Sequence, residues 1–205
     1  MRVVAIDGPV GSGKSTVAKA VADRLDLPYL ESGAMYRVVA LAALRRGIDP
    51  NAEGSADAVT ALAAEVDMEL GERVTVDGTD VTADLRSPEV GRVVSAVAAM
   101  PGVRTELVRR QREWVEEQGG AVVEGRDIGS VVFPDADLKV FLTASAEERA
   151  RRRELDETAD DLARRDLLDS TRAVSPLIVP QGAVVVDTTG RPAGEVVDEI
   201  LSLLA

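Results

Sequence analysis

The chain has 205 residues, 45% of them hydrophobic and 29% charged, which suits one compact domain and is too apolar for disorder and too charged for a membrane protein. It contains neither cysteine nor histidine, which excludes disulfides, serine-histidine hydrolases and most zinc enzymes. The formal net charge of −12 argues against a general nucleic-acid binder. The N-terminal apolar run is too short for a signal peptide, so we expect a cytoplasmic protein with no membrane partner.

Apolar, β-branched runs alternate with helical patterns along the chain. Strands are predicted at 2–7, 28–31, 121–124, 138–142 and 183–187. Helices are predicted at 15–25, at 32–46 with Ser32 as cap and Gly47 as stop, at 89–118 with a break at Pro101, after a Ser145–Glu148 capping box, and at 192–204. Residues 67–82 alternate around an Asp77-Gly78 turn, which indicates a small antiparallel insert. Strands separated by helices predict a parallel α/β sheet with ligands beyond the carboxyl ends of its strands.

A phosphate-binding motif follows the first predicted strand. Residues 8–15 read Gly-Pro-Val-Gly-Ser-Gly-Lys-Ser, between an apolar strand and a helix. Glycines let consecutive N–H groups surround an anion, and the following helix presents its positive end. Lys14 can reach the β- and γ-phosphates, and the Ser15 hydroxyl can ligate Mg²⁺. The predicted ATP-binding residues are Gly8, Pro9, Val10, Gly11, Ser12, Gly13, Lys14, Ser15 and Thr16.

Three further segments carry charge at places where it can meet a nucleotide. They are 31–37 (Glu-Ser-Gly-Ala-Met-Tyr-Arg), 124–127 (Glu-Gly-Arg-Asp) and 164–172, which places Arg165, Asp169 and Arg172 on one helical face. Each also has a plain interpretation: a capped helix with a solvated Arg37, a charged loop, and a surface ladder of ion pairs. Beside a triphosphate site, arginines converging on it instead favour transfer between two phosphates. A GTPase is disfavoured because its Asn-Lys-x-Asp stretch is missing and Asn51 is the only asparagine.

These motifs, in this order, resemble the bacterial cytidylate kinases. The resemblance also includes residues 95–104 (Ser-Ala-Val-Ala-Ala-Met-Pro-Gly-Val-Arg), 124–134 and 169–176 (Asp-Ser-Thr-Arg-Ala-Val-Ser-Pro), so it covers nearly the whole chain. It implies a P-loop NTPase fold of α/β class with a five-stranded parallel sheet flanked by helices. The implied divisions of this single domain are a core at about 1–31, 119–153 and 164–205, a monophosphate-binding lobe with the insert at 32–118, and a short lid at 154–163.

The resemblance implies transfer of the ATP γ-phosphate to CMP or dCMP, with Mg²⁺. We expect a monomer that acts on small molecules. The resemblance places Arg37 and Arg126 on the CMP phosphate and Ser32 and Tyr36 in the acceptor pocket. It has the cytosine read by Ser95, Arg104, Asp127 and Arg172, and the ribose approached by Arg165 and Asp169. Two alternatives stay open, namely a kinase for UMP or another small metabolite, and a nucleotide-binding regulator without turnover.

Two departures from the family pattern affect these expectations. Glu124 stands where many relatives have Asp, which leaves its contact open. Residues 154–163 contain five acids and no base, and relatives carry a longer segment there. We therefore expect Arg153, assisted by Arg149 one turn earlier, to neutralise charge on the transferring phosphoryl group, unless both are solvated partners of Glu148 and Glu154. The expected catalytic residues are Lys14, Arg126, Arg149 and Arg153.

Overall fold

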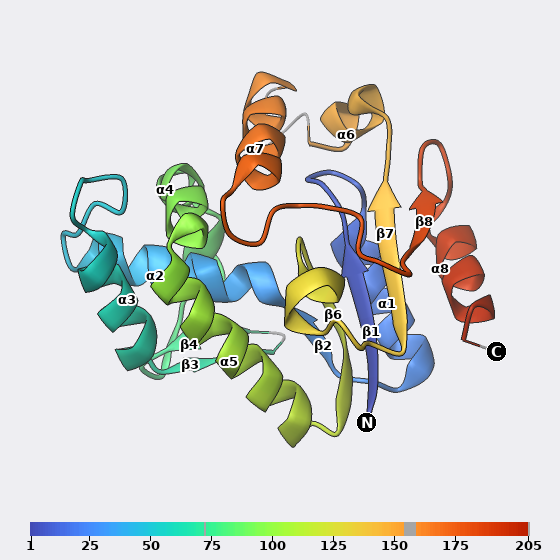
Figure 1. Cartoon of the computed structure of the whole chain (residues 1–205), viewed down its shortest axis with the longest axis horizontal. Coiled ribbons are helices and arrows are strands. Elements are labelled where there is room, and N and C mark those ends of the chain that lie inside the picture. Colours follow the sequence, from blue (N-terminus) through green and yellow to red (C-terminus); the bar gives the residue numbers. More distant parts are fainter. Residues whose placement is uncertain (72, 154–158, 205) are drawn as a thin grey trace. The chain divides into compact units, whose positions relative to one another are not determined.

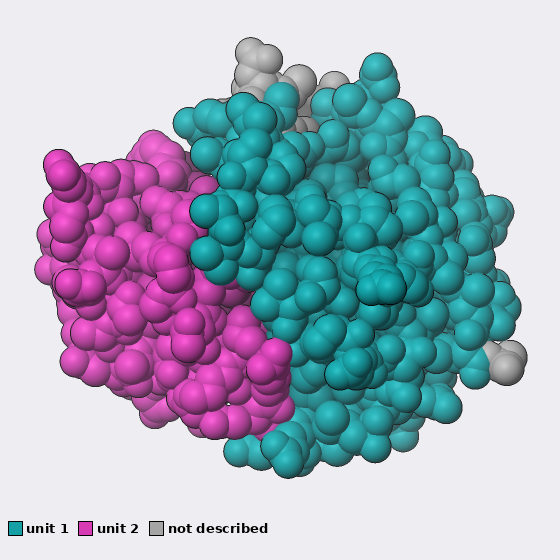
Figure 2. Space-filling model, in the orientation of Figure 1, with its two compact units in different colours: residues 1–30, 114–205 teal, residues 31–113 magenta. Residues whose placement is uncertain are grey.

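The computed structural model describes residues 1–71, 73–153 and 159–204, without the side chains of 153, 159–162 and 165 (Figure 1). The chain divides into unit 1, residues 1–30 and 114–205, and unit 2, residues 31–113, which are coloured separately in Figure 2. Residues 154–158, half of the expected lid, fall outside the described residues. No described helix is long and apolar enough to cross a membrane.

Unit 1 is built on a parallel sheet. Its elements, with β2 at the boundary, are β1 (Arg2–Asp7), α1 (Lys14–Leu25), β2 (Tyr29–Glu31), β6 (Gly120–Gly125), the π-helical turn η2 (Ile128–Val132), β7 (Leu138–Thr143), α6 (Ala146–Arg153), α7 (Ala159–Thr171), β8 (Val184–Asp187) and α8 (Ala193–Ser202). The strand order is β2-β6-β1-β7-β8. In the register of the centre, Ile6 lies beside Glu124 and Val140. The predicted five-stranded parallel sheet is confirmed.

One face of this sheet forms a core with α1 and α8. Alternate residues of β1, Val4 and Ile6, are fully buried there with Val21 of α1 and Ile200 of α8. Val3, Ala5 and Asp7 of β1 are buried as well, and Arg2 at its start is exposed, as expected for a central strand of a parallel sheet. The sheet is thus fixed on apolar contacts, and its carboxyl ends carry the polar residues.

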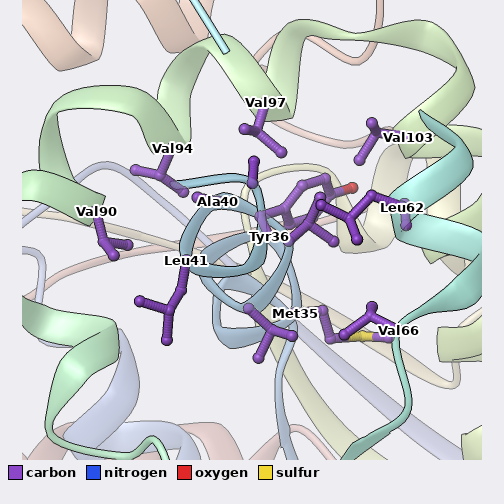
Figure 3. Packing of buried hydrophobic residues seen from close by; sticks show 14 of the residues in the cluster. Met35, Tyr36, Ala40, Leu41, Leu62, Val66, Val90, Val94, Val97 and Val103 are labelled. Atoms are coloured by element: carbon purple, nitrogen blue, oxygen red, sulfur yellow. The ribbon is translucent and has the colours of Figure 1, made fainter. Parts of the chain in front are cut away.

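Unit 2 is mainly helical. Its elements are α2 (Ser32–Arg45), α3 (Ala56–Glu65), β3 (Met68–Glu69), β4 (Thr75–Val76), β5 (Thr79–Asp80), the 3₁₀ turn η1 (Asp84–Arg86), α4 (Pro88–Ala99) and α5 (Pro101–Glu117). Apolar residues on α2, α3, α4 and α5 pack together around Tyr36 and Ala40 (Figure 3). The predicted antiparallel insert is confirmed as the sheet β3-β4-β5, and its turn has positive φ at both Asp77 and Gly78.

Two predicted helix caps differ from the structure. Ser32 is not the cap of α2: β2 runs directly into the helix, so Glu31 takes the cap position and Ser32 is the first helical residue. At Ser145 only half of the capping box forms. The Glu148 N–H donates to Ser145 Oγ (3.2 Å), but the Glu148 carboxylate binds Arg151 and Arg152, and the Ser145 N–H donates to Thr189 Oγ1 (2.9 Å).

Two helical glycines of unit 2 predict opposite effects of the same substitution. A Cβ at Gly91 in α4 would meet nothing within 4 Å, whereas one at Gly102 in α5 would lie 2.6 Å from Thr60 Oγ1. We expect Gly91→Ala to raise the free energy of unfolding by about 0.5–1 kcal/mol through helix propensity. We expect Gly102→Ala to lower it by about 1–2 kcal/mol through overpacking. Urea unfolding followed by circular dichroism checks both, and equal increases for the two variants would contradict the packing at Thr60.

Candidate active site

The phosphate loop (residues 8–15) joins β1 to α1 through backbone that suits glycine. Gly8, Gly11 and Gly13 have φ of 151°, 76° and 86°. A Cβ at Gly8 would lie 2.1 Å from the Leu142 carbonyl oxygen, and one at Gly11 would lie 2.9 Å from that of Arg149. The glycines of the motif are therefore required by backbone conformation and by the close approach of β7 and α6.

The end of this loop is the N-terminus of α1. Gly13 takes the cap position in left-handed conformation, and its carbonyl accepts from the Val17 N–H (3.1 Å). No side chain caps this end of α1 in the described structure. The first-turn N–H groups and the positive end of the helix dipole are consequently available to an anion.

The main-chain carbonyls of Gly8 to Ser12 each accept a hydrogen bond from a side chain. The donors are Arg126 to Gly8 (3.1 Å), Lys14 to Pro9 (2.8 Å), Arg149 to Val10 (3.2 Å), Arg152 to Gly11 (3.4 Å) and Thr188 to Ser12 (3.0 Å). Pro9 also accepts from Ser12 Oγ (3.0 Å), and four of these six donors are cationic. The loop is thus surrounded by positive charge and its carbonyl oxygens are engaged by side chains.

Lys14 is buried, with 7% of its surface exposed. Burial, followed by the neighbouring Arg126 charge, lowers the pKa of its ammonium to about 7, while Glu124, Asp7 and Asp169 act in the opposite direction. Bringing a phosphate close to Lys14 would favour its charged form.

Glu124 lies next to the carboxyl end of β6, the neighbour of the central strand β1, and its carboxylate accepts a hydrogen bond from Ser15 Oγ (2.8 Å). Glu124 is buried, with 5% of its surface exposed. Hydroxyl and carboxylate oxygens are the ligands that Mg²⁺ prefers. No cluster of three acidic or other metal-ligating side chains occurs among the described residues. The pair therefore fits an Mg²⁺ ion that is held mainly by phosphates and water.

Arg126 connects β6 to α7. Its Nε donates to Asp169 (2.9 Å), and Asp169 also lies 3.8 Å from Arg172. Asp169 is 8% exposed, so this ion-pair cluster is largely shielded from water. The structure brings Arg126, Asp169 and Arg172 together within unit 1, which disagrees with a plain surface ladder.

Asp7 holds the turn that carries Arg126 and Asp127. Its two carboxylate oxygens accept from the N–H groups of Ile128 and Gly129, both at 2.8 Å, and Asp7 is fully buried. Burial raises its pKa to about 6, against the effect of the two N–H donors. Asp127 is 5% exposed at the start of η2.

The arginines of α6 differ in their contacts. Arg149 reaches the phosphate loop and also pairs with Asp166 of α7, so it is not a solvated partner of Glu148. Arg153 and Arg165 have side chains outside the described residues. The partner of Glu148 facing the loop is Arg152, which was not among the predicted residues.

The remaining predicted residues lie in unit 2. Ser32 and Tyr36 are one turn apart and buried on α2. Arg37 donates to the Leu85 carbonyl oxygen (3.0 Å), and Ser95 is half-buried on α4. Arg104 is 3% exposed, donates to the Ala98 carbonyl oxygen (3.0 Å) and lies over the Tyr36 ring at 5.4 Å. The structure thus brings Tyr36 and Arg104 together.

Sequence reasoning missed Asp7, Arg152 and Thr188. Asp7 is the last residue of β1 and Thr188 comes directly after β8, and a polar residue at the carboxyl end of a strand is a usable signal in a parallel sheet. Arg152 is four residues after Glu148, a spacing that indicates an ion pair but not a contact with the loop.

Comparisons with known proteins support one family. The family model described as cytidylate kinase matches residues 4–205. The chain is 49% identical to a cytidylate kinase of Desulfitobacterium hafniense (strain Y51), covering 98% of this chain and 91% of that protein. It is 50% identical to a cytidylate kinase of Mycobacterium avium (strain 104), covering 98% and 94%.

Solved structures support the same fold at low identity. A shikimate kinase from Acinetobacter baumannii in complex with shikimate has a TM-score of 0.53 at 15% identity and covers 100% of this chain and 93% of that one. A gluconokinase from Sinorhizobium meliloti 1021 has a TM-score of 0.52 at 18% identity, covering 99% and 91%. The phosphate-loop geometry and the extended matches agree: this chain belongs to the cytidylate kinase family.

Proposed function

We propose that this chain transfers the γ-phosphoryl group of ATP to CMP or dCMP, giving ADP and CDP or dCDP. The observation that carries the proposal is the phosphate loop at the uncapped N-terminus of α1, in a chain whose family match extends from residue 4 to 205. A loop of this kind binds the phosphates of a nucleoside triphosphate.

The donor triphosphate is held by the residues from Gly8 to Thr16. Main-chain N–H groups of the loop surround its β-phosphate, and Lys14 replaces its contact with the Pro9 carbonyl by one with the β- and γ-phosphates. Mg²⁺ that accompanies the triphosphate would be held by Ser15, with Glu124 beside it. When bound, the ion neutralises charge on the phosphate oxygens.

The acceptor phosphate is held by Arg126, with Arg37 as a second predicted contact. Asp127 accepts a hydrogen bond from the cytosine amino group, since uracil presents an oxygen acceptor at that position and would be repelled. Ser95, Arg104 and Arg172 are predicted to contact the base as well. Ser32 and Tyr36 line the pocket, and Arg165 and Asp169 approach the ribose.

The reaction needs positioning and charge neutralisation more than proton transfer. The attacking atom is an already anionic phosphate oxygen of CMP, so no general base is required, in keeping with a chain without histidine. Lys14 and Arg126 stabilise the charge that is spread over the transferring group. We propose that Arg149, beside the loop, and Arg153, four residues later on the same helix, assist them.

We further propose that the chain acts as a monomer in the cytoplasm on small molecules, without nucleic-acid or membrane partners. The net charge of −12 supports the expectation of no nucleic-acid or membrane partner, because a broad cationic face is what a nucleic acid or an anionic membrane would attract.

The test of this function is ADP release in a coupled assay with ATP, Mg²⁺ and a panel of nucleoside monophosphates. We expect the highest kcat/KM for CMP and dCMP. Lys14→Ala should keep its fold, by circular dichroism, and lose about 10²-fold or more in activity, because a preorganised charge on the transferring phosphate is removed. Preference for another acceptor, or near-normal turnover by folded Lys14→Ala, would contradict the proposal.

The choice of acceptor should depend on Asp127. We expect Asp127→Asn to lower kcat/KM for CMP and to narrow the ratio between CMP and UMP by about tenfold, because an amide can also donate to the uracil oxygen. Asp135→Asn is a matched control on an exposed loop position of unit 1. An unchanged CMP to UMP ratio in Asp127→Asn removes this residue from base recognition.

A further inference from the structure

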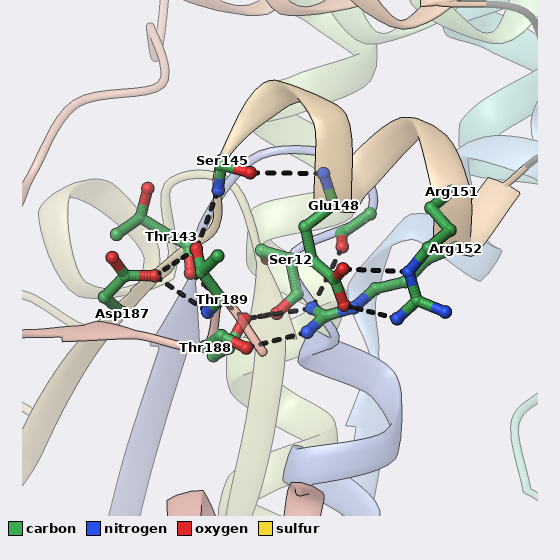
Figure 4. A network of polar contacts seen from close by, with 10 residues as sticks. Ser12, Thr143, Ser145, Glu148, Arg151, Arg152, Asp187, Thr188 and Thr189 are labelled. Carbon is green, nitrogen blue, oxygen red and sulfur yellow. Dashed lines mark hydrogen bonds and ion pairs between the residues drawn. The ribbon is translucent and has the colours of Figure 1, made fainter. Parts of the chain in front are cut away.

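Two of the side chains that reach the carbonyls of the phosphate loop from other elements have no place in the proposed reaction. Lys14, Arg126 and Arg149 are each assigned to a phosphate. Arg152 of α6 and Thr188, which follows β8, contact the carbonyls of Gly11 and Ser12 (Figure 4). Neither residue has a role in the proposed reaction.

Thr188 is a buried junction between three elements. It is 3% exposed, its N–H donates to the Thr143 carbonyl oxygen of β7 (2.9 Å), and its hydroxyl lies 3.1 Å from the same oxygen and 3.0 Å from that of Ser12. A hydroxyl has one proton to donate. Since the Thr143 oxygen already receives the N–H, the hydroxyl proton is best used on Ser12.

Arg152 fixes the orientation of that hydroxyl. Its Nη1 donates to Thr188 Oγ1 (2.9 Å) and its Nη2 to the Thr188 carbonyl oxygen (2.7 Å), while Nε donates to Glu148 (2.8 Å). Because Thr188 Oγ1 accepts from Arg152, its proton is directed away from the guanidinium. A planar guanidinium held at three points cannot rotate without losing several of these bonds together.

The orientation of the Ser12 carbonyl decides the direction of the next N–H. A peptide unit is planar and trans, so the Gly13 N–H points opposite to the Ser12 carbonyl oxygen. With that oxygen tied to Thr188, the Gly13 N–H faces away from Thr188. Gly13 has positive φ and no side chain, so without this tie its peptide units could turn at little steric cost.

We infer that Arg152 and Thr188 are positioning residues for the donor nucleotide: Arg152 orients the Thr188 hydroxyl, which holds the Ser12 carbonyl so that the Gly13 N–H is directed at the phosphate. The inference rests on the proposed function, because it assumes that the loop binds the donor. Through Arg152, α6 is directly connected to the phosphate loop, and residues 154–158 follow α6 in the sequence.

The chain offers a matched control for each variant. Thr189 is the adjacent threonine, and its hydroxyl contacts Ser145 and Asp187 but not the phosphate loop. Arg151 is the adjacent arginine, 67% exposed, and binds Glu148 as Arg152 does. Thr188→Ser keeps the hydroxyl and serves as the conservative variant.

The experiment measures the Kd of ADP by calorimetry, the KM values for ATP and CMP, and the thermal midpoint of each variant. We expect Thr188→Val to raise the Kd of ADP and the KM for ATP by about fivefold, because one hydrogen bond is lost. Arg152→Ala should raise both constants by about tenfold, because several hydrogen bonds are lost. The KM for CMP at saturating ATP should stay within about twofold. Thr188→Ser, Thr189→Val and Arg151→Ala should bind ADP like the unmodified chain.

If the two residues had a purely structural role, their variants would have a lower thermal midpoint and less active protein. The KM for ATP would then not rise relative to the KM for CMP. An unchanged Kd of ADP in Thr188→Val and Arg152→Ala, or equal increases in their controls, overturns the inference. If Thr188→Val does not fold, Arg152→Ala against Arg151→Ala decides by the same criterion. If the unmodified chain itself does not bind ADP, the proposed function fails, an outcome distinct from failure of the positioning role.

Discussion

The loop between β1 and α1 must direct its N–H groups at an anion, and that requires its carbonyl groups to be satisfied elsewhere. The structure meets this constraint with side chains drawn from α1, from α6 and from the segments after β6 and β8, so that each carbonyl from Gly8 to Ser12 accepts from a side chain. Each of these elements follows a strand of the parallel sheet. The order of the sheet therefore places the donors around the loop.

The same arrangement explains the electrostatics of unit 1. Cations gathered for phosphates repel one another, and burial together with the Arg126 charge lowers the pKa of Lys14. The negative charges of the buried Glu124 and Asp169 offset this effect, and the two carboxylates bind Ser15 and Arg126. Perturbed groups at the carboxyl ends of strands are typical of a functional site.

Most of the fold and the phosphate loop could be predicted because their signals are local. The strand, the glycines and Lys14 lie within one short segment, and the sheet follows from alternating strands and helices. The contacts of Ser12 with Thr188 and of Asp7 with Ile128 and Gly129 join residues more than 100 positions apart, and no local pattern reports them. The cap of α2 was predicted wrongly because Ser32 has the right chemistry, but the strand before it ends too late to leave it outside the helix.

The contacts of Glu124 and of the α6 arginines illustrate a second limit. Their charge and position predicted proximity to a nucleotide, but only packing decides which of several adjacent arginines faces the loop. Arg149 and Arg152 do so, three positions apart on α6, and Arg151 between them is exposed. Helical spacing makes Arg149 and Arg152 neighbours on one face, yet it does not say which face meets the loop.

The most direct test of this account is a crystal structure of the chain with ADP and Mg²⁺. The account predicts the β-phosphate within hydrogen-bond distance of the Gly13 N–H, Lys14 Nζ on a phosphate oxygen in place of the Pro9 carbonyl, and the Ser12 carbonyl still bound to Thr188. A β-phosphate outside the phosphate loop, or a Ser12 carbonyl that has turned away from Thr188 toward the nucleotide, would contradict it.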